Sequence, residues 1–157
     1  MKAKEKCRIV SQECIASDIY SMWLQTDKIA KNAVPGQFVS LYTRDGSKLL
    51  PRPISLCEID REKGQLRLVY RVTGKNTGTE MFSKCHAGVP LETMGPLGNG
   101  FPLSEVKGKR VFLIGGGIGI PPMLQTAREL EAESVAVLGY RDELFLNEEF
   151  EKYCPVY

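Results

Sequence analysis

The hydrophobic pattern of this chain changes once, near residue 105, and the change divides the fold into two parts. Before it, apolar and polar residues alternate, and in residues 65–72 one face carries Leu66, Leu68, Tyr70 and Val72. Alternation of period two is typical of a half-buried β-strand. After it, residues 110–114 contain a continuous apolar run, which is typical of a parallel strand buried on both faces. The two parts therefore predict two different sheet architectures.

The alternating part contains six short apolar segments that are separated by turn residues such as glycine and proline. We expect strands at residues 8–15, 19–25, 37–43, 54–59, 65–72 and 90–94. Thr77 and Glu80 have the spacing of a helix capping box, so a short helix is expected at residues 78–84. Six short strands at this spacing predict an all-β architecture, either an antiparallel barrel or a sandwich.

The second part has the order strand, glycine turn, helix, strand. Residues 115–119 are mostly glycine, and Pro121 and Pro122 follow, where proline suits the first turn of a helix. A second apolar strand is expected at residues 134–138, and the start of another helix at residues 143–152. This βαβ unit predicts an α/β domain. Two parallel strands with one full crossover helix cannot easily cover both faces of their sheet, so the domain is expected to be incomplete.

The composition argues against several classes of function. The formal net charge is +2 and no five consecutive residues are Lys or Arg, so nucleic acid is not an expected partner. No window reaches the roughly 18 apolar residues of a membrane helix, and a signal peptide is lacking, so we expect a cytoplasmic protein. None of the five cysteines is spaced as C-x-x-C, which predicts reduced thiols and no metal site. His86 is expected at the surface, and no catalytic residue is predicted.

The glycine turn is the first candidate binding site. It consists of Gly115, Gly116, Gly117, Ile118 and Gly119. Backbone amides between a buried strand and a helix favour an anionic group, which predicts dinucleotide binding. The turn departs from the pattern G-x-G-x-x-G, because Ile120 stands three residues after Gly117. A purely structural tight turn is the alternative.

Three further candidates lie in the alternating part. Arg52 offers a planar fork for a phosphate and Ser55 a hydroxyl for a ring edge, although a surface arginine and a strand serine are the simpler interpretation. Thr77 either caps the short helix or accompanies a pyrophosphate on the amides of residues 77–79. Tyr70 either stacks on a flat heterocycle or belongs to the core, which its position favours.

Six segments, taken in chain order, resemble the ferredoxin–NADP reductase superfamily. They are residues 35–38, 52–55, 69–71, 74–77, 95–101 and 115–122. The likeness is closest to the electron-transfer subunits of the NADH-using, B-type dihydroorotate dehydrogenases. The resemblance implies a six-stranded antiparallel barrel that holds FAD, over residues 1–102. It implies that residues 108–157 are the N-terminal part of an NAD(P)-binding α/β domain.

The resemblance also implies roles for individual residues. Arg52, Pro53, Ile54 and Ser55 would bind the flavin and a phosphate, and Val69, Tyr70 and Arg71 would line the isoalloxazine ring. Asn76 and Thr77 would hold the pyrophosphate. Asn76 stands where the family has glycine, and Gly78-Thr79 offers an alternative register two residues further on. Nicotinamide would bind at residues 115–119. The family's cysteine-rich [2Fe–2S] segment has no counterpart in this chain.

The expected function is that of an FAD-dependent NAD(P)H oxidoreductase subunit that passes electrons to a partner redox protein. The resemblance implies that this partner is the catalytic subunit of dihydroorotate dehydrogenase, in pyrimidine biosynthesis. The alternatives are a subunit serving another acceptor, of ferredoxin or hydrogenase type, and a truncated flavin-holding module without catalysis. The uncovered apolar strands further predict that residues 110–157 either pack against another chain, such as a second copy, or are less stable than the barrel.

Overall fold

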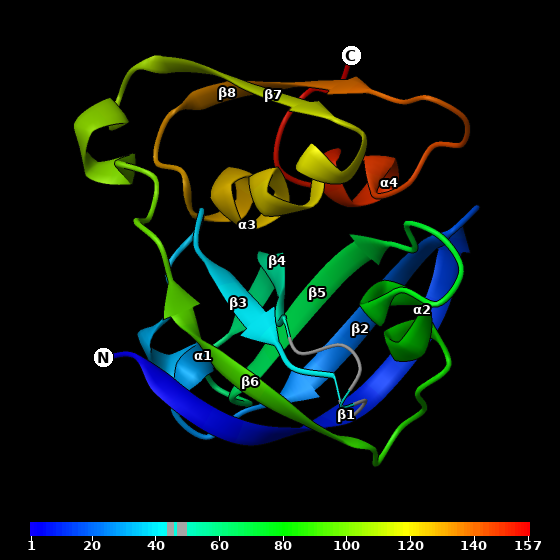
Figure 1. Cartoon of the computed structure of the whole chain (residues 1–157). Helices are drawn as coiled ribbons and strands as arrows, with labels where there is room; N and C mark the ends of the chain where they lie inside the picture. The colour runs from blue at the N-terminus through cyan, green and yellow to red at the C-terminus, as the bar shows by residue number, and fades with distance from the viewer. Residues whose placement is uncertain (44–45, 47–49) are drawn as a thin grey trace.

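The alternating part of the chain closes into a six-stranded antiparallel barrel in the computed structural model, which describes residues 1–43, 46 and 50–157 (Figure 1). The strand order is β1-β2-β5-β4-β3-β6. The elements are β1 (Ala3–Ala16), β2 (Ile19–Gln25), α1 (Ile29–Asn32), β3 (Phe38–Leu41), β4 (Arg52–Asp60), β5 (Gln65–Arg71), α2 (Gly78–Ser83) and β6 (Pro90–Leu97). All six predicted strands are present, and the barrel alternative is confirmed over the sandwich. The short helix α1 was not predicted.

The interior of the barrel is the first of two apolar cores. Leu66, Leu68 and Tyr70 of β5 point into it, as the alternation predicts, and each is at most 1% exposed. Phe82 of α2 is 1% exposed and closes the same core. Because the sheet closes on itself, each of its strands has a hydrogen-bonded neighbour on both sides, and no edge is left open to another chain.

The outward face of β5 corrects the expectation of a half-buried strand. Arg67 and Val69 point away from the barrel interior, yet they are only 7% and 2% exposed. The second part of the chain covers them. A strand with a polar residue on its outer face is therefore buried on both sides, which the alternation alone cannot show.

The α/β region, residues 103–157, contains two parallel strands and short helices. Its elements are η1 (Leu103–Val106), β7 (Arg110–Gly116), η2 (Gly117–Gly119), α3 (Pro121–Glu129), β8 (Glu133–Gly139) and α4 (Asn147–Phe150). The predicted βαβ unit is confirmed, with β7 and β8 paired from Arg110↔Glu133 to Gly116↔Gly139. The chain end extends this sheet, since Tyr157 N donates to Ala136 O of β8 at 2.9 Å.

The predicted helix at residues 143–152 is shorter than expected. Its α-helical part, α4, begins only at Asn147. Leu146 precedes it with φ = 66°, a left-handed conformation that cannot continue a right-handed helix. The apolar character of residues 144–146 therefore belongs to a turn, and Phe145 and Leu146 pack into the second core from there.

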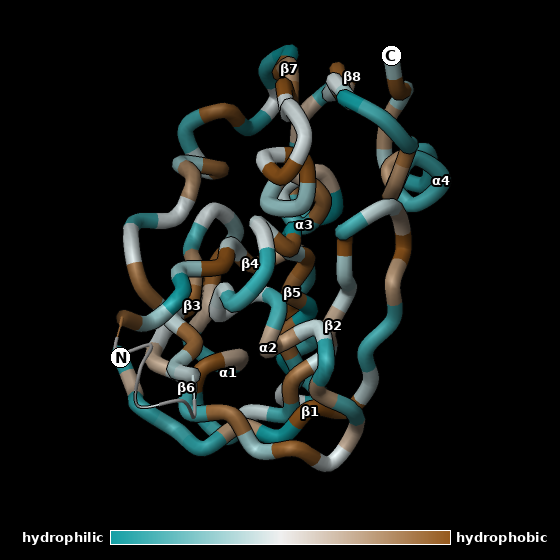
Figure 2. Tube along the Cα trace, turned by 45° about the vertical axis from the view of Figure 1, so that its right-hand side comes forward, coloured by the Kyte–Doolittle hydropathy of each residue, from teal (hydrophilic) through white to brown (hydrophobic). Residues whose placement is uncertain are grey.

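The second core lies between the barrel and the β7–β8 sheet. Figure 1 shows α3 and α4 in this layer, and the view in Figure 2 agrees. Cys57 and Val69 of the barrel pack there with Leu124 of α3 and Phe150 of α4. The Gln125 side chain of α3 accepts a buried hydrogen bond of 2.7 Å from Ile59 N of β4. The α/β region is thus joined to the barrel by apolar packing and by buried hydrogen bonds.

The far face of the β7–β8 sheet corrects the expectation of strands buried on both sides. Leu113 and Ala136 face α3 and are buried, whereas Phe112, Ile114 and Val137 are 62%, 70% and 39% exposed. We refer to these three as the outer apolar face. No other described strand pairs with β7. The described residues also include no helix that is long and apolar enough to cross a membrane.

Candidate functional site

A cleft of about 330 Å³ opens where the barrel faces the glycine turn. Its walls come from β4, β5, the segment around the start of α2, and η2. The lining residues are Arg52, Pro53, Ile54, Ser55, Val69, Tyr70, Arg71, Thr73, Thr79 and Ile118. The fold thus brings all the predicted residues of segments 52–55 and 69–71 together with one residue of the glycine turn. Asn76, Thr77 and the glycines of residues 115–119 do not line this cleft.

Arg52 lies against the first residue of α2. A Cβ atom on Gly78 would stand 2.8 Å from Arg52 Nε and 3.1 Å from Arg52 Cγ, so a side chain at this position would require Arg52 to move. The Arg52 side chain is half-buried, and its Nη1 donates to Leu50 O at 2.7 Å. This contact joins a cationic fork to the backbone at the start of α2, which is a suitable arrangement for a phosphate.

A group of threonine hydroxyls forms the adjoining wall. Thr77 caps α2 as predicted, because its Oγ1 accepts from Glu80 N at 3.2 Å. It also donates to Gly74 O at 2.8 Å. Thr79 Oγ1 accepts from Thr73 N at 3.2 Å and lies 3.1 Å from Thr77 Oγ1. Thr77 therefore supports Thr79, which lines the cleft together with Thr73.

The turn before α2 has a left-handed residue at Asn76, as expected where asparagine stands in place of the family's glycine. Asn76 has φ = 58°, in the left-handed region where asparagine replaces glycine at the lowest cost. Its side chain is exposed and outside the cleft. Of the two registers that the sequence leaves open, the one at Gly78-Thr79 contributes Thr79 to the cleft lining, and the one at Asn76-Thr77 contributes no lining residue. Thr73 and Thr79 line the cleft, although Thr73 is not among the predicted site residues and Thr79 appears there only in the alternative register. The pair Gly78-Thr79 was a usable signal for Thr79, whereas nothing in the sequence singled out Thr73.

The glycines of the turn divide into two kinds. Gly115 is needed for packing, because a Cβ there would stand 2.9 Å from Ile120 Cα. Gly117 has φ = +51°, which disfavours other residues. Around Gly116 and Gly119, a Cβ would meet no other described atom within 4 Å. The structural-turn interpretation explains the first two glycines, but Gly116 and Gly119 leave open backbone that a ligand can approach.

Tyr70 belongs to the core, as its position favours, although it also contributes to the cleft wall. Its ring is 1% exposed and is stacked on Tyr20 with the centroids 6.0 Å apart. Its hydroxyl donates to Gln12 Oε1 at 2.7 Å. Burial raises the pKa of Tyr70, so the phenol stays protonated and remains a hydrogen-bond donor at neutral pH.

An ion pair between a buried arginine and a partly exposed glutamate connects β5 to α4. Arg67 donates to Glu58 Oε2 at 2.8 Å and to the two carboxylate oxygens of Glu149 at 2.5 and 3.2 Å. Its Nε also donates to Ser21 Oγ at 2.8 Å. Burial favours the neutral form of Arg67, but the hydrogen bonds to the two carboxylates outweigh it and raise its pKa above the usual value. Arg67, two residues before Val69, thus holds α4 against the barrel.

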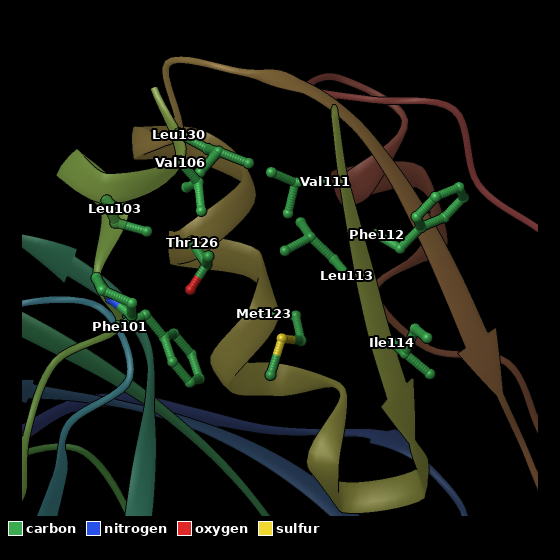
Figure 3. A pocket seen from close by; sticks show the side chains of 11 residues that line it. Phe101, Leu103, Val106, Val111, Phe112, Leu113, Ile114, Met123, Thr126 and Leu130 are labelled. Carbon is green, nitrogen blue, oxygen red and sulfur yellow. The ribbon is translucent and has the colours of Figure 1, made fainter. Parts of the chain in front are cut away.

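A second cavity, of about 340 Å³, lies between η1, β7 and α3 (Figure 3). Its lining residues are Phe101, Pro102, Leu103, Val106, Val111, Phe112, Leu113, Ile114, Met123, Thr126 and Leu130. In Figure 3, Leu113 points toward α3, whereas Phe112 and Ile114 point away from it. Because the lining contains no charged side chain among the described residues, this cavity has no group to hold a phosphate.

The cysteines and the histidine do not form a metal centre in the described part of the chain, where no group of three His, Cys, Asp or Glu residues could hold an ion. Cys7, Cys57 and Cys154 are buried, Cys14 is exposed, and none of the five cysteines forms a disulfide. Burial raises the pKa of Cys7 to about 11 and that of Cys57 still further. His86 is exposed, as predicted.

The barrel, the cleft and the glycine turn together define a class of protein. Residues 6–101 match the family described as the oxidoreductase FAD-binding domain. The chain belongs to this family of FAD-binding oxidoreductases. The predicted resemblance to ferredoxin–NADP reductases is confirmed by this match and by the relatives that follow. The donor set fits the family's cofactor, because the guanidinium of Arg52 and the hydroxyls of Thr73 and Thr79 line one cleft, and Gly78 lies against Arg52.

Particular relatives narrow this class further. The chain is 42% identical to a Streptococcus mutans protein named dihydroorotate dehydrogenase B (NAD(+)), electron transfer subunit, over 99% of this chain and 62% of that protein. It is 37% identical to the protein of the same name from Bacillus mycoides, over 100% of this chain and 62% of that protein. A solved NADH-dependent reduced ferredoxin-NADP oxidoreductase superposes with a TM-score of 0.85 at 29% identity, over 99% of this chain and 57% of that chain. The chain thus spans less than two thirds of the length of these relatives.

Proposed function

We propose that this chain binds FAD in the cleft between the barrel and the glycine turn, as part of an electron-transfer subunit that takes electrons from NADH. One observation carries the proposal. The predicted flavin segments, residues 52–55 and 69–71, line a single cleft that Ile118 of the predicted nicotinamide turn also lines. The flavin site and the nicotinamide site, between which electrons must pass, would then share a wall of the cleft.

We assign the diphosphate of FAD to Arg52 and to the backbone at Gly78 and Thr79. The contact between Arg52 and Gly78 supports this register over Asn76 and Thr77, whose part is to shape the turn and to cap α2. Pro53, Ile54 and Ser55 on one strand, with Val69, Tyr70 and Arg71 on the next, would hold the ring system. When bound, FAD supplies the redox chemistry, and the protein supplies binding, orientation and exclusion of water.

The nicotinamide dinucleotide is assigned to Gly115, Gly116, Gly117, Ile118 and Gly119. The open backbone at Gly116 and Gly119 supports this assignment. Ile118 is 43% exposed and lines the flavin cleft, so a dinucleotide on this turn would lie beside the flavin. No acid or base from the protein is needed for hydride transfer between two such cofactors, and we assign no catalytic residue.

The partner that we propose is the catalytic subunit of a dihydroorotate dehydrogenase in the cytoplasm. The name shared by the Streptococcus and Bacillus relatives supports this choice. A subunit that serves a ferredoxin-type acceptor is the second candidate, and the structural likeness to a ferredoxin-NADP oxidoreductase favours it. Two results would support the dihydroorotate dehydrogenase subunit over the ferredoxin-type acceptor. They are co-purification of the chain with a dihydroorotate-oxidising subunit, and reduction of the bound flavin by dihydroorotate in that complex.

The cofactor assignment is tested by replacing Arg52 with alanine. The variant loses a charge-assisted hydrogen bond, so its FAD affinity should fall by about 1.5–3 kcal/mol, roughly 10- to 150-fold in Kd. The matched control is Arg8→Ala, which removes an exposed arginine from β1 and should leave the Kd unchanged. Equal flavin affinity in the wild-type chain and in both variants would contradict the assignment of Arg52.

A further inference from the structure

The side-chain amide of Gln12, in the middle of β1, makes three hydrogen bonds that connect three elements. Its Nε2 donates to Phe82 O at 2.9 Å and to Cys85 O at 2.7 Å, at the C-terminal end of α2. Its Oε1 accepts from Tyr70 Oη of β5 at 2.7 Å. These three bonds form the Gln12 bridge. They use both donors and one acceptor position of the amide, so the side chain has one preferred orientation.

The bridge lies behind two walls of the cleft. Tyr70 belongs to the β5 wall, and its ring also meets Phe82 of α2 edge to face, with the centroids 6.3 Å apart. The same helix begins with Gly78 and Thr79, which lie beside Arg52 and in the cleft wall. A helix of six residues has few internal hydrogen bonds to hold its direction. Its position relative to β5 therefore depends on contacts such as the bridge.

We propose that Gln12 is a positioning residue for FAD, which holds the start of α2 at a fixed distance from the β5 wall through Tyr70. Gln12 does not line the cleft itself. It acts through Tyr70 and through the carbonyls at the end of α2. The inference rests on the proposed FAD site, and it adds that the site's geometry is set by a β1 residue outside the segments that the sequence singled out.

The chain supplies a matched control in Gln25. Gln25 Nε2 donates to Lys63 O at 2.8 Å and to Gly64 O at 3.3 Å, and its Oε1 accepts from Gln65 Nε2 at 3.0 Å. It is a second partly buried barrel glutamine with two donated bonds and one accepted bond. Gln25 pairs with Gln65 at the start of β5, whereas the cleft residues of that strand lie four to six residues further on, roughly 13–20 Å away at 3.3 Å per residue.

The experiment measures FAD binding to the apoprotein by flavin fluorescence for the wild type, Gln12→Met, Gln25→Met, Tyr70→Phe, and the double variant Gln12→Met/Tyr70→Phe. Methionine keeps the length of the side chain and removes its hydrogen bonds. We expect Gln12→Met to raise the Kd about tenfold and Gln25→Met to raise it less than about twofold. At saturating FAD, the visible circular dichroism of the bound flavin should change in Gln12→Met and stay as in the wild type in Gln25→Met.

Tyr70→Phe keeps the ring in the core and removes only its hydroxyl, so it also tests the bridge if Gln12→Met fails to fold. We expect about a threefold rise in Kd, and we expect the double variant to bind no more weakly than Gln12→Met, because both changes break the same connection. Equal Kd values for Gln12→Met and Gln25→Met, or effects of Gln12→Met and Tyr70→Phe that multiply, would overturn the inference and leave the FAD site intact. No FAD binding by the wild type would overturn both.

Discussion

The barrel and the α/β region meet the same requirement, burial of apolar strands, in different ways. In the barrel, β1 to β6 close into a ring, and α2 closes the core with Phe82. In the α/β region, α3 and α4 cover one face of β7 and β8, while the outer apolar face stays exposed. A closed sheet completes its own core, whereas an open parallel sheet needs helices on both faces. The stability of the α/β region therefore depends on its contact with the barrel, and the proposed FAD site lies beside that contact.

Truncation of a core residue should show the largest contrast between the two sheets. Leu68→Ala empties a fully buried position in the barrel, so it should lower the free energy of unfolding by about 2–5 kcal/mol. Ile114→Ala removes a side chain that is 70% exposed, and its effect should stay within about 0.5 kcal/mol. Urea unfolding of both variants measures this difference. A comparable loss in Ile114→Ala would mean that the outer apolar face is covered in solution.

The ion pair between Arg67 and Glu149 should hold the α/β region to the barrel. Glu149→Gln removes the charge that faces a buried guanidinium, and because the Glu149 side chain is 32% exposed we expect a loss of about 1–3 kcal/mol, below that of a fully buried pair. Glu148→Gln changes the exposed neighbour on the same helix and serves as control. Hydrogen exchange should accelerate in residues 133–157 of the first variant only. Unchanged exchange there would show that apolar packing alone joins the two regions.

Thiol labelling compares how readily the two cores open, at one cysteine in each core. Of the three comparisons, we expect this one to show the smallest difference in free energy. Cys7 lies in the barrel core and Cys57 in the core shared with the α/β region. Burial raises the pKa of Cys7 to about 11 and that of Cys57 further, so little reactive thiolate exists in the folded state below pH 9, and labelling requires opening. We expect Cys14, which is exposed, to react first, then Cys57, then Cys7. If Cys7 were labelled as fast as Cys57, the two regions would open together.

Local pattern was enough to predict the barrel strands, because each strand buries alternate residues in a single core. β2 matches its predicted bounds, and Thr77 caps α2 as the capping box requires. The sequence could not predict that Arg67 and Val69 are buried, since their cover comes from residues more than forty positions further along the chain. Long-range placement of this kind is not contained in the period of a strand.

The sequence likewise predicted some residues of the candidate site and not others. Segments 52–55 and 69–71 were identified by their likeness to a family, and both line the cleft. Gln12 gave no signal, because a glutamine in an exposed-looking strand has no motif and its partners are 58 to 73 residues away. The sequence also does not distinguish Gly115, which packing requires, from Gly116, which packing does not require. This distinction depends on distances in the folded structure.

Hydrogen exchange of the isolated chain with and without FAD tests whether the cleft beside the contact of the two regions is the FAD site. Bound ligand slows exchange where it contacts the backbone or stabilises the fold around it. If FAD binds there, we expect slower exchange in residues 52–55, 69–79 and 116–119, on both sides of the cleft. Slowing confined to the cavity between η1, β7 and α3, or no slowing at saturating FAD, would contradict it.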